Sequence, residues 1–273
     1  MTDETERAPE GQRIAKWIAR VGICSRREAE RLIAEGRVDV DGAAPDGPGV
    51  VVADPTRIAV DGERLPPPAP TRLFRYHKPA GRIVAERDPE GRPSIYDDLG
   101  DNLPRLVPIG RLDLASEGLL LLTNDGEIKR WLELPSTGWI RRYRARVFGR
   151  VDERDLAKLA GGVTIDGVAY GGIKATLDGG QGKNQWLSIS LREGKNREVR
   201  RVLQHLGLTV NRLIRTAYGP FQLGKLNAGH VAEVPPKVMA EQLGLAMPSD
   251  AHVGRAKRKS QPTKPNANRR RRA

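Results

Sequence analysis

The sequence has little cysteine and histidine. Cys24 is the only cysteine, so no intramolecular disulfide can form and an oxidising compartment is not indicated. The histidines are scattered rather than clustered at metal-ligand spacing, and no glycine-rich segment has the strand-to-helix context of a nucleotide-binding loop. We therefore expect neither a metal nor an organic cofactor. The four histidines are His77, His205, His230 and His252.

Long apolar runs are also absent. No stretch approaches the roughly 20 residues of a membrane span, and the N-terminal segment MTDETERAPEGQR lacks the apolar core of a signal peptide. We expect a cytoplasmic protein without a membrane partner. Acidic residues are missing after Asp250, where nine cationic residues follow. Such a segment buries too little apolar surface to offset the entropy of ordering, so residues 248–273 are predicted to form a disordered basic tail.

Positive charge is in excess over the whole chain. Lysine and arginine number 47 against 34 acidic residues, which gives a formal net charge of +13 and a pI of about 10.2. This balance favours a polyanionic partner, with nucleic acid first and an acidic membrane surface second. The 273 residues suffice for a catalytic domain with a smaller partner domain.

The N-terminal 64 residues have the pattern of a compact helical and β unit. Apolar residues at helical spacing predict a helix over residues 12–21, and Ser25-Arg26-Arg27-Glu28 is a capping box that opens a second helix. Residues 37–42 and 57–62 alternate and end in Asp-Gly, which is typical of short strands with tight turns. A proline-rich linker follows at residues 65–71.

A purely structural role accounts less well for residues 110–126, GRLDLASEGLLLLTNDG, than for any other segment of the chain. The four leucines of this segment, 119–122, indicate a strand buried on both faces. Just before it, Arg111 and Asp113 lie on a loop between Gly110 and Gly118, and glycine permits backbone angles that other residues resist. From these residues alone, a surface ion pair between Asp113 and Arg111 is as good an interpretation as a catalytic carboxylate.

Two further segments are rich in arginine. In residues 141–147, Tyr143 and other apolar residues share one strand face while arginines occupy the other, which could lie on phosphates. The segment LREGKNREVRR, residues 191–201, follows an alternating strand and opens a helix, for which Asn196 is the predicted N-cap. Arg197 and Arg200 are three residues apart, so they are expected on one helix face.

The two motifs at 110–126 and 191–201 resemble, in the same order, those of the pseudouridine synthases that act on ribosomal RNA, in the branch that contains the small-subunit enzyme and the large-subunit enzymes B and F. The Tyr-x-Lys-Pro-x-Gly entry at residues 76–81 agrees with this, and the N-terminal unit resembles the alpha-L RNA-binding domain, which is named after a small-subunit ribosomal protein. The resemblance implies an α+β fold. Its parts are an RNA-binding domain at 11–64, the linker at 65–71 and a catalytic domain at 72–247 with a mixed, mostly antiparallel sheet flanked by helices.

The resemblance also implies roles for individual residues. Asp113 would be the catalytic residue, kept ionised by pairing with Arg200, and Tyr143 would pack against the target uracil. The reaction detaches the base of a uridine and rejoins it through carbon, without net oxidation, so no cofactor is implied. The residues expected to bind RNA are Lys16, Arg26, Arg27, Arg31, Arg111, Arg142, Arg144, Lys195, Arg197 and Arg201.

Whole-chain resemblance is nearest to the large-subunit enzymes of type B, through the Asp-Pro-Glu-Gly-Arg-Pro loop at residues 88–93, Asn-Gln-Trp at 184–186 and the Arg-Leu-Ile-Arg run at 212–215. The expected partner is therefore 23S ribosomal RNA, naked or in a pre-ribosomal particle, bound by a monomer. Three alternatives stay open. They are a synthase acting on 16S ribosomal RNA, a non-catalytic assembly factor, and a glycosidase using Asp113 and Glu117, which so basic a chain disfavours.

Overall fold

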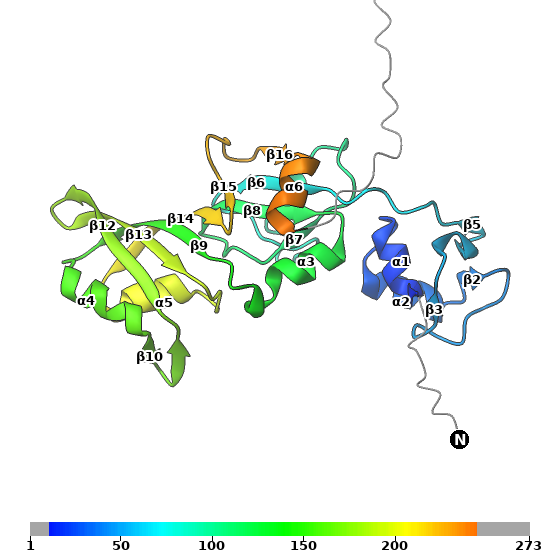
Figure 1. The fold of residues 1–273 in the computed structure, drawn as a ribbon, viewed down its shortest axis with the longest axis horizontal. Helices are drawn as coiled ribbons and strands as arrows, with labels where there is room; N and C mark the ends of the chain where they lie inside the picture. Colours follow the sequence, from blue (N-terminus) through cyan, green and yellow to red (C-terminus); the bar gives the residue numbers. More distant parts are fainter. Residues whose placement is uncertain (1–10, 245–273) are drawn as a thin grey trace, which may run out of the picture.

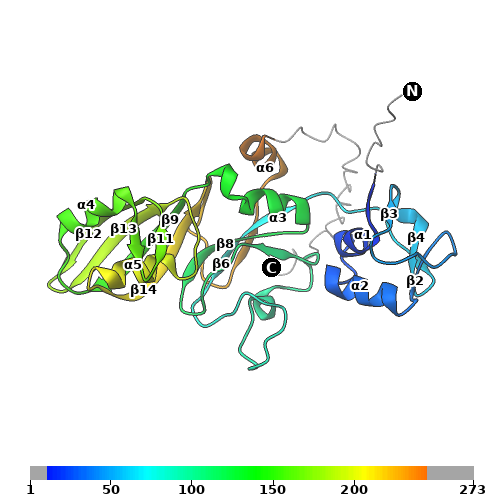
Figure 2. The same cartoon turned by 90° about the horizontal axis from the view of Figure 1, so that it is seen from below.

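A computed structural model describes residues 11–244 of the chain. The predicted disordered tail at 248–273 and the last residues of the predicted catalytic domain, 245–247, lie outside the described residues. Three parts follow one another along the long axis, with the N-terminal domain at one end and the two halves of a large sheet beyond it (Figures 1 and 2). None of the helices within residues 11–244 is long and apolar enough to cross a membrane.

The N-terminal domain packs two helices against two small sheets. Its core joins Ile14 and Ile18 of the first helix to Leu32 of the second and Ile58 of the sheet. The Ser25 side chain accepts a hydrogen bond from the Glu28 backbone N–H, so the predicted N-cap of the second helix is confirmed. The elements are β1 (Gln12–Arg13), α1 (Ile14–Arg20), α2 (Arg26–Ala34), β2 (Val38–Val40), β3 (Val51–Val52), η1 (Pro55–Arg57), β4 (Ile58–Val60) and β5 (Glu63–Arg64).

The first helix begins later than the apolar spacing predicted. Residues 12 and 13 form strand β1, which pairs antiparallel with β3. The Ile14 N–H donates to the Val50 carbonyl oxygen, so this end of the helix is held by the sheet rather than by further helical turns. The prediction of helix from residue 12 was therefore wrong by two residues, because strand pairing across the domain satisfied those backbone groups instead.

The predicted catalytic domain is built on a nine-stranded sheet, mostly antiparallel, with strand order β12-β13-β9-β14-β8-β6-β16 and with β15 and β7 paired to β14 and β8. Its strands are β6 (Leu73–Lys78), β7 (Val107–Ile109), β8 (Glu117–Thr123), β9 (Arg141–Phe148), β12 (Ile173–Gln181), β13 (Asn184–Leu191), β14 (Thr209–Tyr218), β15 (Phe221–Gln222) and β16 (Val231–Glu233). A separate hairpin is formed by β10 (Val163–Ile165) and β11 (Val168–Tyr170). The helices are η2 (Ile95–Asp98), α3 (Gly126–Glu133), η3 (Pro135–Thr137), α4 (Glu153–Lys158), η4 (Leu159–Gly161), α5 (Glu198–His205) and α6 (Pro236–Leu243).

The half of the sheet formed by β6, β8 and β16 is covered on both faces. Leu119 and Leu121 pack with residues of α3 and α6, whereas Leu120 and Leu122 pack on the other face with Ile95 and the loop before β7. All four leucines are fully buried. The predicted strand with two buried faces is therefore confirmed, and it gives the loop that precedes it a rigid support.

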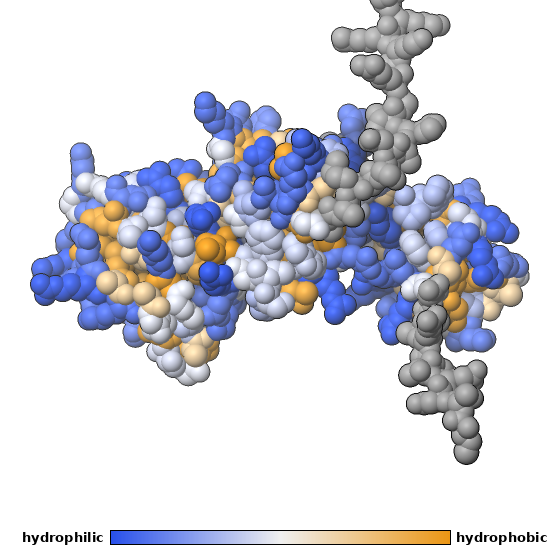
Figure 3. Space-filling model, viewed as in Figure 1, coloured by the Kyte–Doolittle hydropathy of each residue, from blue (hydrophilic) through white to orange (hydrophobic). Residues whose placement is uncertain are grey.

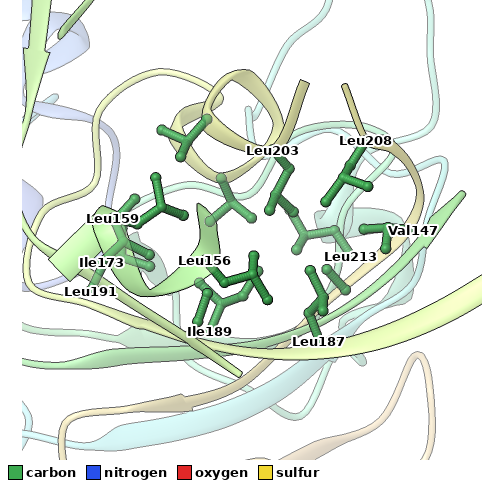
Figure 4. Packing of buried hydrophobic residues seen from close by; sticks show 14 of the residues in the cluster. Val147, Leu156, Leu159, Ile173, Leu187, Ile189, Leu191, Leu203, Leu208 and Leu213 are labelled. Carbon is green, nitrogen blue, oxygen red and sulfur yellow. The ribbon is translucent and has the colours of Figure 1, made fainter. Parts of the chain in front are cut away.

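The half of the sheet formed by β12, β13, β9 and β14 is covered on one face. Helices α4 and α5 pack there through Leu156, Val202 and Leu203 onto Val147 and Leu187 (Figure 4). The alternation of β9 follows from this packing, since Ala145 and Val147 are buried while Arg144 and Arg146 are exposed.

The two halves meet where β14 runs parallel to β8. This is the one parallel pair of the large sheet in the described chain, and it spans only Ile214 opposite Glu117 and Arg215 opposite Gly118. Gly118 has φ +103°, and a Cβ placed on it would collide with the backbone of Arg215. Only glycine permits this close approach, so Gly118 belongs to β8 rather than to the loop, where the sequence placed it.

A polar cluster joins the N-terminal domain to the catalytic domain. Arg20 of α1 donates to the Asn124 carbonyl oxygen (3.3 Å) and the Ala69 carbonyl oxygen (3.0 Å), and it lies 3.3 Å from the Asp125 carboxylate. Thr71 donates to the same carboxylate at 2.6 Å. Arg20 and Asp125 are largely shielded from water, with side chains 15% and 12% exposed, so the cluster fixes the linker and α1 on the turn before α3.

We predict that Arg20→Ala loosens this junction by about 1–3 kcal/mol, because it removes an ion pair with a shielded carboxylate and hydrogen bonds to two carbonyl groups. Hydrogen–deuterium exchange should become faster at the amides of Arg72 and Glu127, which bond to Asn124 and Asp125. Arg31→Ala is the control, since Arg31 is exposed and pairs only with Glu28 and Glu35. Equal exchange in both variants would show that Arg20 does not hold the domains together.

Candidate active site

The loop between β7 and β8 carries Asp113 at the junction of the two sheet halves. Lys78 holds the backbone of this loop. Its ammonium group donates to the carbonyl oxygens of Asp113 (3.2 Å), Leu114 (3.3 Å) and Ser116 (2.8 Å). A fourth bond reaches the Pro79 carbonyl oxygen at 3.0 Å. Lysine has three donors, so the ammonium group is fully engaged in holding this loop.

Lys78 itself is fully buried at the end of β6. Burial lowers the pKa of its ammonium group to about 8, and the carboxylates of Asp113 and Glu117 oppose this shift. The sequence interpretation missed Lys78 as a site residue. The signal was present, because the period of two along β6 places Lys78 on the same buried side as Phe74 and Tyr76.

The carboxylate of Asp113 is 31% exposed and faces Arg197, with 3.8 Å between Oδ2 and Nη1. The predicted ion pair of Asp113 with Arg200 is not formed. Arg200 donates instead to the carbonyl oxygens of Val210 (2.9 Å) and Ala115 (3.0 Å). Burial lowers the pKa of the Arg200 guanidinium, Arg197 adds to this shift, and Asp113 opposes it. Arg200 therefore supports the loop two residues beyond Asp113.

The start of α5 explains why Arg197, rather than Arg200, faces Asp113. The helix begins at Glu198, and its N-cap is Arg197, which has a left-handed backbone with φ +51° and no side-chain capping bond. The prediction of Asn196 as N-cap was wrong, because the Glu198 carboxylate accepts the Lys195 backbone N–H (2.8 Å) and closes a turn over residues 195–198. Arg197 thus lies outside the helix, so it does not share a helical face with Arg200.

A cavity of about 230 Å³ lies between this loop, the start of α5 and the ends of β9 and β14. Asp113 and the half-buried Tyr143 line it, as do Arg111, Lys195 and Arg197. Tyr143 lies on the α5 side of β9, packed against the buried clusters of both sheet halves. The structure therefore brings the predicted carboxylate and the predicted aromatic ring to one cavity from segments 30 residues apart in sequence.

Three further residues of the cavity lining carry buried polar atoms that have no hydrogen-bond partner among residues 11–244. These atoms are Ser116 Oγ, Glu198 Oε1 and Arg215 Nη2. Glu198 is 3% exposed, and burial raises the pKa of its carboxyl group. Arg215 is 2% exposed and donates through Nε to the Leu119 carbonyl oxygen at 2.7 Å. Unpaired buried donors and acceptors are rare in native proteins. The lining of this cavity therefore retains hydrogen-bonding groups that the described protein itself does not use. The sequence interpretation assigned no role to these three residues.

The small cavity borders a much larger cleft, about 1410 Å³, between the N-terminal domain and the catalytic domain. Eleven cationic and six acidic residues line it, and the cations include Lys16, Arg26 and Arg27 on the domain facing Asp113. In Figure 3, hydrophilic residues gather where the two domains meet. Such a basic cleft suits a polyanion wide enough to touch both domains. Arg111, Lys195 and Arg197 line both the cleft and the cavity.

Four residues predicted to bind RNA lie away from the cleft and the cavity. Arg31 is exposed on α2 and pairs with Glu28 and Glu35, so its side chain is engaged outside the cleft. Arg201 is exposed on α5 without lining either hollow. Arg142 and Arg144 lie on the face of β9 opposite to Tyr143. These four arginines therefore do not line the hollows that Lys195 and Arg197 line, and for Arg142 and Arg144 the sheet lies between.

The fold is that of pseudouridylate synthases. A solved structure described as a pseudouridylate synthase superposes with a TM-score of 0.61 at 24% sequence identity, covering 85% of this chain and 99% of that one. The model of the RNA pseudouridylate synthase family matches residues 72–205, and the S4 domain model matches residues 12–44.

Curated relatives define the family. An uncharacterised RNA pseudouridine synthase of Rickettsia felis is 42% identical over 231 residues, which cover 84% of this chain and 99% of the relative. Ribosomal large subunit pseudouridine synthase B of Yersinia pestis is 40% identical over 225 residues, covering 79% of this chain and 70% of that protein. The chain belongs to the RNA pseudouridine synthase family, as its sequence motifs predicted, and it is an isomerase that acts on RNA.

Proposed function

We propose that this enzyme converts a uridine of 23S ribosomal RNA to pseudouridine, with Asp113 as the catalytic carboxylate and Tyr143 as the surface on which the base stacks. The observation that carries the assignment of residues is that Asp113 and Tyr143 line one small cavity bordering a basic cleft. The choice of 23S RNA rests on the likeness to large-subunit enzymes of type B.

The proposed reaction requires the uridine to leave its stack and enter the cavity. Flipping costs a few kcal/mol, and stacking on an aromatic ring such as Tyr143 returns about 1–3 kcal/mol per base. The basic cleft would hold the RNA backbone while the buried polar atoms of Glu198 and Arg215 offer an acceptor and a donor to the polar edge of the base. This arrangement suits a pyrimidine bearing both carbonyl oxygens and an N–H.

The chemistry itself exchanges one bond of the ribose C1′ atom for another. The bond from C1′ to N1 breaks, the base rotates, and C1′ bonds to C5, after which the C5 hydrogen leaves as a proton and N1 gains a proton. The Asp113 carboxylate can attack covalently or remove a sugar proton. The Arg197 guanidinium lies 3.8 Å from the Asp113 carboxylate and stabilises its negative charge in either route.

The test is tritium release from RNA labelled at uridine C5. We expect the wild-type protein to release label from a 23S transcript, or from a precursor large-subunit particle, and not from 16S RNA. Release from 16S RNA alone would show that the substrate is the RNA of the small subunit instead. If no ribosomal RNA or precursor particle released label, a non-catalytic role in assembly would replace this proposal. Mapping pseudouridines in cells lacking the gene then identifies the nucleotide.

A further inference from the structure

The sheet face opposite to α4 and α5 is open and basic. Strand alternation and register place its side chains in three rows, in which Arg146 pairs with Trp186 and Arg212, Arg144 with Ser188 and Ile214, and Ser190 with Arg142 and Lys174. The cationic members of these rows are all exposed, and the two helices that cover this half of the sheet pack on its other side. We call this surface the open sheet face. It comprises Arg142, Arg144, Arg146, Phe148, Lys174, Thr176, Trp186, Ser188, Ser190, Arg212 and Ile214.

Positive charge predominates on the open sheet face. The Arg212 guanidinium donates two hydrogen bonds to the Glu117 carboxylate, at 2.7 and 2.9 Å. Arg144 Nε lies 3.3 Å from Asp178 Oδ2. The other three cations are Arg142, Arg146 and Lys174, and none of them has an ion-pair partner within residues 11–244. Arg142 and Arg146 are four residues apart on one strand with Arg144 between them, so successive guanidinium groups repeat about every 7 Å, at the strand's two-residue rise. Such a ladder is suited to successive phosphates of a nucleic acid strand.

Aromatic groups lie among these cations. The Arg144 guanidinium lies over the Trp186 ring, 4.7 Å from its centre, and Phe148 is 46% exposed at the end of β9. Basic side chains mixed with aromatic rings are the features by which proteins hold unpaired nucleic acid strands. A protein partner fits less well, because the centres of protein interfaces are depleted of charged residues.

The open sheet face cannot serve the strand that occupies the active site. Arg142 and Arg144 flank Tyr143 in sequence, but alternation turns them to the side of the sheet away from the cavity. An RNA segment that reached both surfaces would have to pass around the edge of the sheet. We propose that the open sheet face is a second RNA-binding surface, which binds an unpaired stretch of the same large RNA outside the segment in the catalytic cleft. This proposal rests on the proposed function for the identity of the RNA.

The test compares two triple variants that lose the same charge. Arg142→Thr, Arg146→Thr and Lys174→Thr remove the unpaired cations of the open sheet face and retain side chains suited to strands. Arg154→Gln, Lys158→Gln and Lys237→Gln remove three exposed cations from α4 and α6. Thermal unfolding of both proteins first establishes that each is folded.

The probes are a 23S transcript and a short hairpin from it that contains the modified uridine. We expect the open-face variant to bind the transcript 10- to 100-fold more weakly than the control variant. Its slope of log affinity against log salt should be smaller by about 2–3, since each lost phosphate contact removes about one unit. Turnover of the short hairpin should equal that of the control variant, because the hairpin fills only the cleft.

Binding of the transcript is measured without turnover, so this result stands apart from the outcome of the tritium assay. Equal affinity and equal salt slope in the two triple variants would overturn the proposal. So would normal binding of the naked transcript with weaker binding to precursor particles, since that pattern assigns the open sheet face to a ribosomal protein. Reduced turnover of the short hairpin would place these residues in the active site, also against the proposal.

Discussion

Asp113→Asn should reduce tritium release by about 10⁴-fold or more, the scale seen when an enzyme loses its nucleophile or base. Asparagine keeps the size and shape of the side chain but can neither attack C1′ nor accept a sugar proton. Single-turnover assays with excess enzyme separate this chemical defect from slow product release. The assay should use the transcript or particle on which the wild-type protein is active.

RNA binding should survive this substitution. The position of the loop depends on its backbone, which Lys78 and Arg200 hold, and within the described chain the Asp113 carboxylate forms an ion pair with Arg197 alone, at 3.8 Å. Removing a negative charge beside a basic cleft should leave affinity unchanged or slightly higher. Asp155→Asn, on the exposed side of α4, is the control and should turn over normally. An Asp113→Asn enzyme with activity within tenfold of wild type would exclude the catalytic role of this carboxylate.

The sequence located the loop that carries Asp113 because its evidence is local. A run of leucines buried on both faces of a sheet requires a strand, and the residues just before that strand must lie at its end. Their place at the junction of the two sheet halves was not predictable, since it depends on β8 pairing with β14 almost 100 residues later. The need for Gly118 also becomes visible only there, where the backbone of Arg215 leaves no room for a Cβ.

The partners of Asp113 were less predictable because they depend on where a helix begins. Helical spacing gave Arg197 and Arg200 a common face, but a turn closed by Glu198 delays the helix and separates them. For β9, alternation correctly divided Tyr143 from Arg142, Arg144 and Arg146, although Arg141 lies on the side of Tyr143. It could not show which face carries the cavity, since α5 and β14, which line the cavity, follow β9 by some 50 residues or more.

Substitution of Lys78 is also expected to reduce activity strongly. Lys78→Met keeps an unbranched side chain of similar length in the buried site but removes the hydrogen bonds that the ammonium group donates to the carbonyl oxygens of Asp113, Leu114 and Ser116. Displacing a catalytic group by about 1 Å can cost about 100-fold in rate, so we expect kcat to fall about 100-fold while RNA affinity is retained. Lys225→Met, at an exposed position, is the matched control.

The pH dependence distinguishes this positioning role from a general loss of packing. Above a pKa of about 8 the amine of Lys78 has two donors instead of three and no charge. The activity of the wild-type enzyme should therefore fall as pH rises through about 8, and this fall should be absent in Lys78→Met. Hydrogen bonds from the Arg212 guanidinium hold the pKa of the Glu117 carboxyl below its usual range, so Glu117, which also acts on Lys78, cannot produce a fall there.

As pH rises above about 8, the free energy of unfolding should rise while activity falls. The folded pKa of Lys78 is depressed below its usual 10.5, so between pH 8 and 10.5 the unfolded chain holds a proton that the folded chain has released. The free energy of unfolding of the wild-type protein should then rise with pH across this interval relative to Lys78→Met. A buried charge that costs stability at neutral pH yet holds the loop of Asp113 is expected of a residue selected for function. If Lys78→Met retained wild-type kcat, or if its pH profile still fell near 8, the loop would be held by other contacts and this role would have to be abandoned.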